Sequence, residues 1–212
     1  MTWVYLVRHG QTAWNAQLIF RGRRDIELNE QGRREARAIA QALKNKHLDA
    51  IYASPLTRAV ETARPIAALL HREIEQVQGL TDINYGDWEG VSHSEIKTRY
   101  PDLLATWEKE PDLVRFPHGE TLDEVRERSY GVLGSLAEKH AVESILIISH
   151  RVVNKVLLCA MLGLSNAHFW NIKQDTGCIN LIEYTSQGLI LCLLNDTCHL
   201  GGIADGVRQL DF

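Results

Sequence analysis

The chain has 212 residues, of which 45% are hydrophobic and 24% charged, and its formal net charge is -4. This size and apolar content support one sizeable core, so we expect a single domain over residues 1–212. The acidic balance argues against a general nucleic-acid binder, and no apolar run is long enough for a membrane span. The first residues lack a basic leader followed by an apolar stretch, and no cysteines form a C-x-x-C pair. We therefore expect no metal site, no nucleic-acid or membrane partner, and a cytoplasmic, reducing location.

The first part of the chain alternates predicted strands and helices. A β-branched and aromatic run predicts a strand at 2–7, and a second apolar run predicts one at 49–54. Between them, residues 29–46 place alanine, isoleucine and leucine at helical spacing, behind an asparagine that suits a helix start. A further helix is predicted over 56–71, and Pro65 within it is expected to start, kink or split that helix.

An irregular segment separates this part from the rest of the pattern. Residues 80–120 are rich in glycine and proline with little periodicity, which predicts a lid-like insertion over one edge. A long polar helix is predicted at 121–140, then a strand at 144–149 whose continuous apolar run is typical of burial on both faces. A helix at 152–163 follows, and two apolar runs around the turn sequence TSQG predict a hairpin over 178–195. The alternation predicts an α/β fold with a mostly parallel sheet between helical layers.

Three predicted strands lead directly into polar side chains. In a parallel sheet, ligands bind beyond the carboxyl ends of the strands. The first strand ends at Arg8 and His9, the second leads into Arg58 one turn along the next helix, and the strand at 144–149 precedes His150. Two arginines and two histidines are therefore expected at one edge of the sheet, and we interpret this edge as a site.

These side-chain types suit a phosphate dianion. Arginine stays charged, and its planar fork matches phosphate oxygens, while the helix N-termini beside the site add backbone donors. A neutral imidazole is a nucleophile near pH 7, so a histidine of this pair can attack phosphorus and form a phosphohistidine. The arginines would neutralise the equatorial oxygens, and a nearby carboxylic acid would protonate the leaving oxygen.

Six motifs in the same order resemble the histidine phosphatase (phosphoglycerate mutase-like) superfamily. They are RHGQTAWN, RG at 21–22, SPLTRAVETA, GDWEG, HGET and ISH, and together they extend over nearly the whole chain. The resemblance implies a three-layer αβα sandwich and a phosphohistidine intermediate, with no cofactor and no metal. The residues that match the family's pocket are the nucleophile His9, then Arg8, Arg58 and His150, and at its edge Asn15 and Arg21.

By position, the resemblance implies Asp82 as the proton donor. The small-phosphatase branch of the family often carries a glutamate four residues before the glycine of its G-x-W-E-G motif, where this chain has an aspartate. Aspartate keeps the chemistry but is shorter by one carbon–carbon bond, roughly 1.5 Å. Glu89 and Glu120 are the other carboxylates that we consider for this role.

The chain length and the GQT and GDWEG sequences are similar to the phosphatase branch. The stretch RYPDLLATWEKEPDLVRFPHGET and the tail LNDTCHLGG resemble metal-independent phosphoserine phosphatases and their broad-specificity relatives. In that subgroup, a histidine directly before the G-x-W glycine helps to hold the substrate amino acid, and this chain has Tyr85 there. His199 is a further candidate at the substrate end of the pocket. The closing residues at 203–212 are expected to fold over the opening or to reach a partner chain.

We therefore expect a metal-independent phosphomonoesterase that acts on small phosphorylated metabolites. Two alternatives remain open at this point: a cofactor-dependent phosphoglycerate-type mutase, and a non-catalytic phospho-ligand sensor on the same fold. The sequence does not set the oligomeric state, but the apolar hairpin at 178–195 can pair with a copy of itself at a sheet edge, which is an argument for a homodimer.

Overall fold

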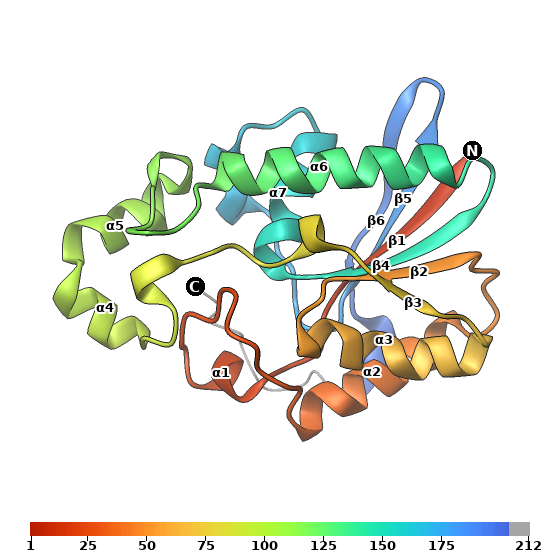
Figure 1. Ribbon diagram of the computed structural model, residues 1–212, viewed down its shortest axis with the longest axis horizontal. Coiled ribbons are helices and arrows are strands. Elements are labelled where there is room, and N and C mark those ends of the chain that lie inside the picture. Colours follow the sequence, from red (N-terminus) through yellow and green to blue (C-terminus); the bar gives the residue numbers. More distant parts are fainter. Residues whose placement is uncertain (204–212) are drawn as a thin grey trace.

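A six-stranded sheet runs through the centre of the computed structural model, which describes residues 1–203 (Figure 1). Its strands lie in the order β3-β2-β4-β1-β5-β6. Four neighbouring strands are parallel, and the last two form an antiparallel extension. The strands are β1 (Thr2–Arg8), β2 (Ala50–Ala53), β3 (Ile74–Gln76), β4 (Ser144–Ser149), β5 (Ile179–Thr185) and β6 (Gly188–Asp196). The mostly parallel sheet and the hairpin are thus confirmed, whereas the short strand β3 was not predicted.

Helices cover both faces of the sheet, as Figure 1 shows. One face carries α2 (Glu30–Leu43) and α3 (Thr57–Leu70), and the other carries α6 (Leu122–Lys139) and α7 (Arg151–Met161). The central strand β4 explains the continuous apolar run in the sequence. Its side chains alternate between the two layers: Ile145 and Ile147 join the core on the α6 and α7 side, and Leu146 and Ile148 join the core on the α2 and α3 side. The predicted three-layer arrangement is confirmed.

Helix α3 runs through Pro65, which stands at its ninth position. The helix neither begins nor ends at the proline, which excludes a start or a split there, and the expected kink stays a prediction. Proline removes one backbone donor from a helix interior. On the side facing the sheet, Ala63, Ile66 and Ala67 are buried in the core. This burial of the apolar side offsets the lost hydrogen bond.

The segment at 80–120 forms two short helices, α4 (His93–Arg99) and α5 (Pro101–Lys109), which lie to one side of the sheet (Figure 1). Their shortness explains why the sequence shows little helical periodicity here. Trp88 packs edge-on against Phe20 and Trp107 against Trp170, both outside the segment, with ring centroids 4.9 and 5.2 Å apart. Such edge-to-face pairs stabilise beyond the area that they bury. The segment is therefore held to the main body by an aromatic core.

Short helical segments complete the described residues. They are α1 (Ala13–Ala16) and the 3₁₀ helices Gln78–Leu80, Gly86–Trp88, Pro111–Leu113, Asn166–Asn171 and Cys198–Ile203. No helix within residues 1–203 is both long enough and apolar enough to cross a membrane. The tail at 204–212, for which the sequence predicts a cover over the site or a contact to a partner, lies outside the described residues.

Candidate active site

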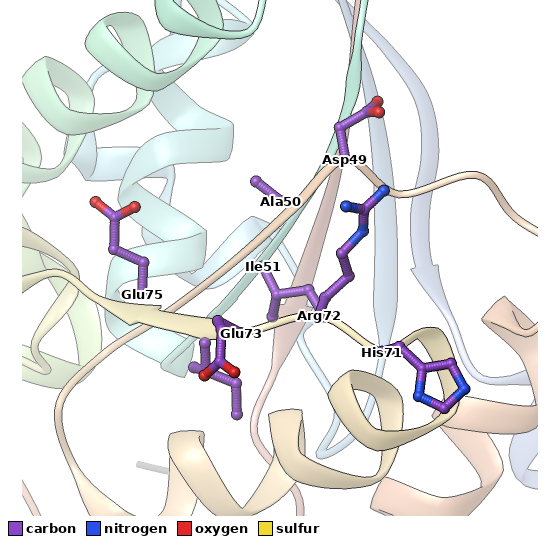
Figure 2. Close-up of a pocket in the computed structure, with 8 residues that line it drawn as sticks. Asp49, Ala50, Ile51, His71, Arg72, Glu73 and Glu75 are labelled. Atoms are coloured by element: carbon purple, nitrogen blue, oxygen red, sulfur yellow. The ribbon is translucent and has the colours of Figure 1, made fainter.

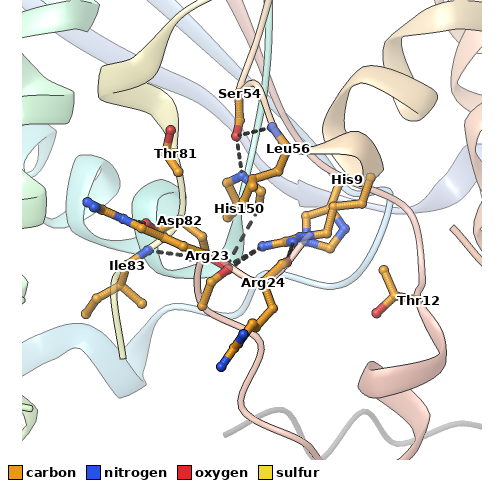
Figure 3. Close-up of polar contacts among 12 residues, drawn as sticks. His9, Thr12, Arg23, Arg24, Ser54, Leu56, Thr81, Asp82, Ile83 and His150 are labelled. Carbon is orange, nitrogen blue, oxygen red and sulfur yellow. Dashed lines mark hydrogen bonds and ion pairs between the residues drawn. The ribbon is translucent and has the colours of Figure 1, made fainter. Parts of the chain in front are cut away.

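The carboxyl ends of β1, β2 and β4 meet at one edge of the sheet, where two histidines face each other. The backbone N–H of His9 donates to Ser149 O at 3.0 Å, and that of Ser54 donates to Ile148 O at 2.9 Å, so the three strand ends are in register. The ring centroids of His9 and His150 are 5.1 Å apart, and both rings are buried (Figure 3). The structure thus brings together the strand ends that the sequence predicted to converge.

The tautomer of His9 follows from its hydrogen bond. Its Nδ1 lies 2.7 Å from the carbonyl oxygen of Gly10, which can only accept, so Nδ1 carries the proton. The lone pair is therefore on Nε2. Burial, together with the positive charges of Arg58 and Arg8, holds the pKa of His9 well below 6.5. The imidazole is consequently neutral at pH 7, which is the nucleophilic form.

The backbone around His9 is fixed by close contact with helix α2. A Cβ atom on Gly10 would lie 2.6 Å from the carbonyl oxygen of Gly32, and one on Gly32 would lie 2.1 Å from the carbonyl oxygen of Gln11. Only glycine fits such an approach. The N–H of Gly10 also donates to the hydroxyl of Thr62 at 3.0 Å. The loop after β1 is therefore held from two helices.

His150 is oriented by Ser54 at the end of β2. The imidazole Nε2 and the hydroxyl Oγ are 2.7 Å apart. The other ring nitrogen, Nδ1, is 3.7 Å from Oδ2 of Asp82. A hydroxyl that donates to Nε2 leaves the proton on Nδ1, where it faces the carboxylate. Burial and the charge of Arg58 hold the pKa of His150 well below 6.5 as well.

Asp82 lies at the histidine pair, as Figure 3 shows. Its Oδ2 accepts a hydrogen bond from Arg58 Nη2 at 3.1 Å, and its Oδ1 accepts from the backbone N–H of Ile83 at 3.0 Å. The side chain is buried. The segment that carries it is tied to α6, because Arg128 donates to the carbonyl oxygens of Thr81 and Asp82 at 2.7 and 3.1 Å. Arg128 was missed in the sequence, because an arginine on a polar helix is typical of a solvated face.

The two other candidate carboxylates make structural contacts. Glu89 Oε1 accepts from the backbone N–H groups of Arg23 and Tyr85 at 2.8 and 3.3 Å. Glu120 forms ion pairs with Arg23 and Arg128 at 2.8 and 3.0 Å. Each carboxylate therefore fixes a loop near the site, and the aspartate is the carboxylate whose ion pairs reach the histidines.

Buried arginines make the site strongly positive. Arg8 and Arg58 are both fully buried. Arg8 Nη1 donates to the carbonyl oxygen of Gln174 at 2.6 Å, and Arg58 donates to the carbonyl oxygens of Gly22 and Arg24, both at 2.8 Å. Carbonyl acceptors hold both guanidinium groups in place, and the Asp82 carboxylate also pairs with Arg58. The concentrated positive charge favours an anionic ligand.

The four predicted substrate-binding residues lie in different settings. Asn15 is buried, and its Oδ1 accepts from the N–H and hydroxyl of Thr12, both at 2.9 Å. Arg21 is buried, and it lies close enough to His9 and His150 for its charge to lower the pKa of both. The Tyr85 ring packs edge-on against other aromatic rings. His199 is half-buried and its Nε2 is 3.0 Å from the carbonyl oxygen of Gly177.

A separate surface pocket lies at the amino ends of β2 and β3, away from this site (Figure 2). It is lined by Asp49, Ala50, Ile51, His71, Arg72, Glu73, Ile74 and Glu75. None of these is a predicted site residue. Among the described residues, no group of three or more histidine, cysteine or acidic side chains is arranged to hold a metal ion.

Comparisons with known proteins point to one family. The model of the "Histidine phosphatase superfamily (branch 1)" matches residues 4–197. The chain is 34% identical over 201 residues to phosphoserine phosphatase 1 of Hydrogenobacter thermophilus, with 95% of each chain covered. It is similar to the solved structure of Bacillus stearothermophilus YhfR, with a TM-score of 0.92, 31% identity, and coverage of 94% of this chain and 100% of that one. A phosphoserine phosphatase mutant from Entamoeba histolytica in complex with phosphoserine gives a TM-score of 0.83, 27% identity, and coverage of 94% and 100%.

Proposed function

The chain belongs to the histidine phosphatase superfamily and is a phosphoric monoester hydrolase, and on this premise we propose that it cleaves small phosphorylated metabolites through a phosphohistidine on His9. The observation that carries the proposal is the pair of buried histidines beside Asp82 and Arg58. No metal or organic cofactor takes part in the proposed reaction.

Binding of the phosphate group rests on the buried arginines. The charges of Arg8 and Arg58 both act on His9, and the forks of these arginines match phosphate oxygens. Helix α7 begins directly after His150, which caps it without a side-chain hydrogen bond. The first backbone N–H groups of this helix add donors and the positive end of its dipole. These groups stabilise the negative charge on phosphorus oxygens during transfer.

In the first step, Nε2 of His9 attacks phosphorus. A nitrogen–phosphorus bond forms, and the bond between phosphorus and the leaving oxygen breaks. Asp82 takes a proton from the bound phosphate monoester as the phosphate oxygens replace it at Arg58, and it gives this proton to the leaving oxygen, so the alcohol leaves neutral. His150, with Nδ1–H facing the same region, donates to a phosphoryl oxygen.

In the second step, the Asp82 carboxylate takes a proton from water, whose oxygen attacks phosphorus. The nitrogen–phosphorus bond breaks, inorganic phosphate leaves, and His9 returns to its neutral form. The carboxyl group thus acts as acid and then as base.

The first experiment is phosphate release in EDTA from a panel of phosphomonoesters. The panel contains p-nitrophenyl phosphate, phosphoserine, 3-phosphoglycerate, a sugar phosphate and α-ribazole phosphate. We expect metal-independent turnover that is lost in His9→Ala. Retained turnover in this variant would disprove the proposed nucleophile. Acid-labile, base-stable phosphate bound to the protein, absent in His9→Ala, would identify the intermediate.

The same panel separates the two alternatives. A mutase would interconvert phosphoglycerates without free phosphate and would depend on a bisphosphorylated primer. A sensor would bind phosphate tightly and turn over none of the substrates. Release of stoichiometric phosphate and alcohol from at least one substrate excludes both.

A further inference from the structure

Arg151, the first residue of helix α7, is a buried cation with incomplete hydrogen bonding. Its side chain is 4% exposed. Its Nε and Nη2 atoms are buried and have no hydrogen-bond partner, and no ion pair to it occurs within residues 1–203. A buried charge without compensation is costly, so such an arginine in a folded protein indicates a missing anion.

The two nitrogens define the shape of the missing partner. Nε–H and Nη2–H lie on the same edge of the guanidinium plane and point in parallel. This edge matches the two oxygens of a carboxylate in a bidentate pair. One face of the guanidinium lies over the Trp170 ring, with its central carbon 5.5 Å from the ring centroid. One turn along the helix, Lys155 adds a second buried cation, 4.5 and 4.6 Å from the ring centroids of Phe169 and Trp170.

This cationic region adjoins the phosphate site. Arg151 directly follows His150 in the chain, so its backbone starts at the site edge. Tyr85 connects the two regions. Burial raises the pKa of the Tyr85 hydroxyl to about 12, and the charge of Arg151 is the main effect that opposes this shift, while the charge of Asp82 adds to it. The tyrosine hydroxyl therefore lies within electrostatic reach of both Arg151 and the proposed proton donor.

We propose that Arg151 binds a carboxylate carried by the phosphomonoester substrate, and that it makes the enzyme selective for phosphorylated acids. This inference rests on the proposed function of the neighbouring site. The phosphoryl group occupies the histidine pair, and the carbon chain leads past Tyr85 to the arginine. Substrates with an acid group a few bonds from the phosphate satisfy both ends, whereas neutral phosphate esters leave the guanidinium unsatisfied.

The test compares two non-hydrolysable phosphonates of equal length by calorimetry. Wild-type protein is expected to bind 3-phosphonopropionate at least tenfold more tightly than propylphosphonate. In Arg151→Met this preference is expected to disappear, while propylphosphonate binds as in the wild type. Arg115→Met, which removes an exposed arginine paired with Glu124, is the matched control and keeps the preference. A third ligand, 1,3-propanebisphosphonate, tests whether the protein prefers a second phosphoryl group to a carboxylate.

Equal affinity of the wild type for the two phosphonates would overturn the proposal, as would an unchanged preference in Arg151→Met. Tenfold tighter binding of the bisphosphonate than of the carboxylate would overturn the assignment to phosphorylated acids. Binding needs no turnover, so this result stands apart from the outcome of the phosphatase assay. If Arg151→Met fails to fold, the comparison of the two phosphonates on the wild-type protein still tests the proposal. Arg151→Lys then tests the bidentate edge, because lysine keeps the charge and loses the fork.

For turnover, the same prediction concerns kcat/KM. The ratio for 3-phosphoglycerate over glycerol 3-phosphate is expected to fall at least tenfold in Arg151→Met and to stay at the wild-type value in Arg115→Met. An equal loss on all substrates would indicate a general structural defect and would count against selectivity.

Discussion

Asp82 and Arg58 form a buried ion pair, with 3.1 Å between the carboxylate Oδ2 and the guanidinium Nη2. The pair joins the proposed proton donor to an arginine that we propose binds the phosphate group. Phosphate oxygens that bind Arg58 compete with the carboxylate for the same nitrogen. We therefore expect substrate binding to loosen the pair and to free Asp82 for the leaving oxygen.

Replacement of the proposed acid has a signature that depends on the leaving group. Asp82→Asn is expected to lower kcat for alkyl phosphates by about 10²–10⁴-fold, the usual contribution of general acid–base catalysis. The loss should be smaller for p-nitrophenyl phosphate, whose leaving oxygen needs less protonation. Glu89→Gln and Glu120→Gln serve as controls. Both should mainly lower the midpoint temperature of unfolding and should reduce kcat much less than Asp82→Asn does. A larger loss of kcat in either control would transfer the acid role to that residue.

Two glycine substitutions should act in opposite directions on stability. Gly32→Ala forces a Cβ to within 2.1 Å of the Gln11 carbonyl oxygen, so we expect it to destabilise by more than about 2 kcal/mol and to lower activity. Gly134→Ala, inside α6 with no atom within 4 Å of the new Cβ, should stabilise by about 0.5–1 kcal/mol. Urea unfolding measures both. Equal effects of the two changes would contradict the close approach of α2 to the site.

The buried histidines make stability depend on pH. The folded-state pKa of His9 is well below 6.5, whereas the unfolded chain binds a proton at about 6.5. Between these values the unfolded state holds more protons, so stability rises with pH and is lost as the pH falls below about 6.5. The free energy of unfolding should therefore be lower at pH 5.5 than at pH 7.5. His9→Gln should reduce this difference, and an unchanged difference would mean that His9 titrates normally.

Val142 occupies an unfavourable backbone conformation on the surface. It has a φ of 66° and is 82% exposed, in the turn between α6 and β4. A β-branched residue is strained in the left-handed region, where glycine is not. Val142→Gly should raise the free energy of unfolding by about 1 kcal/mol, with no change in kcat. Val142→Ala, which keeps a Cβ, should gain less, and an equal gain would point to side-chain exposure as the cause.

The homodimer expected from the hairpin remains a prediction. Strand β6 is the last strand of the sheet, and Ile190, Leu193 and Leu194 on it are exposed. Light scattering should give a dimer mass for the wild type and a monomer mass for Ile190→Lys. A monomeric wild type would mean that these side chains remain in solvent.

The sequence predicted the layers and the position of the site because these depend on local patterns. Continuous apolar runs marked the buried strands, and polar residues directly after them marked the strand ends that meet at the candidate site. The sequence left a start, a kink or a split open at Pro65, because burial of the neighbouring alanine and isoleucine side chains is a tertiary effect. Strand β3 was missed because three residues carry too little periodicity.

Contacts between distant segments could not be predicted from the sequence. Nothing near Arg128 indicates that it holds the carbonyl oxygens beside the proposed acid, 46 positions away. Arg151 has a signal that can be recognised afterwards, namely a charged residue directly after the ISH motif and before an apolar helix. Its burial among aromatic rings depends on residues near 170, which the linear pattern does not connect to it.

The order of strands in the sheet has a consequence for synthesis of the chain. Strand β1 leads into the proposed nucleophile, yet its hydrogen-bonded neighbours are β4 and β5, which begin at Ser144 and Ile179. At ribosomal rates of 5–20 residues per second, β1 waits roughly 7–30 s for β4 to be made. During this time its apolar side chains have no native partner in the sheet. The newly made chain is therefore most exposed to aggregation, and most in need of chaperones, before the second half of the protein is translated.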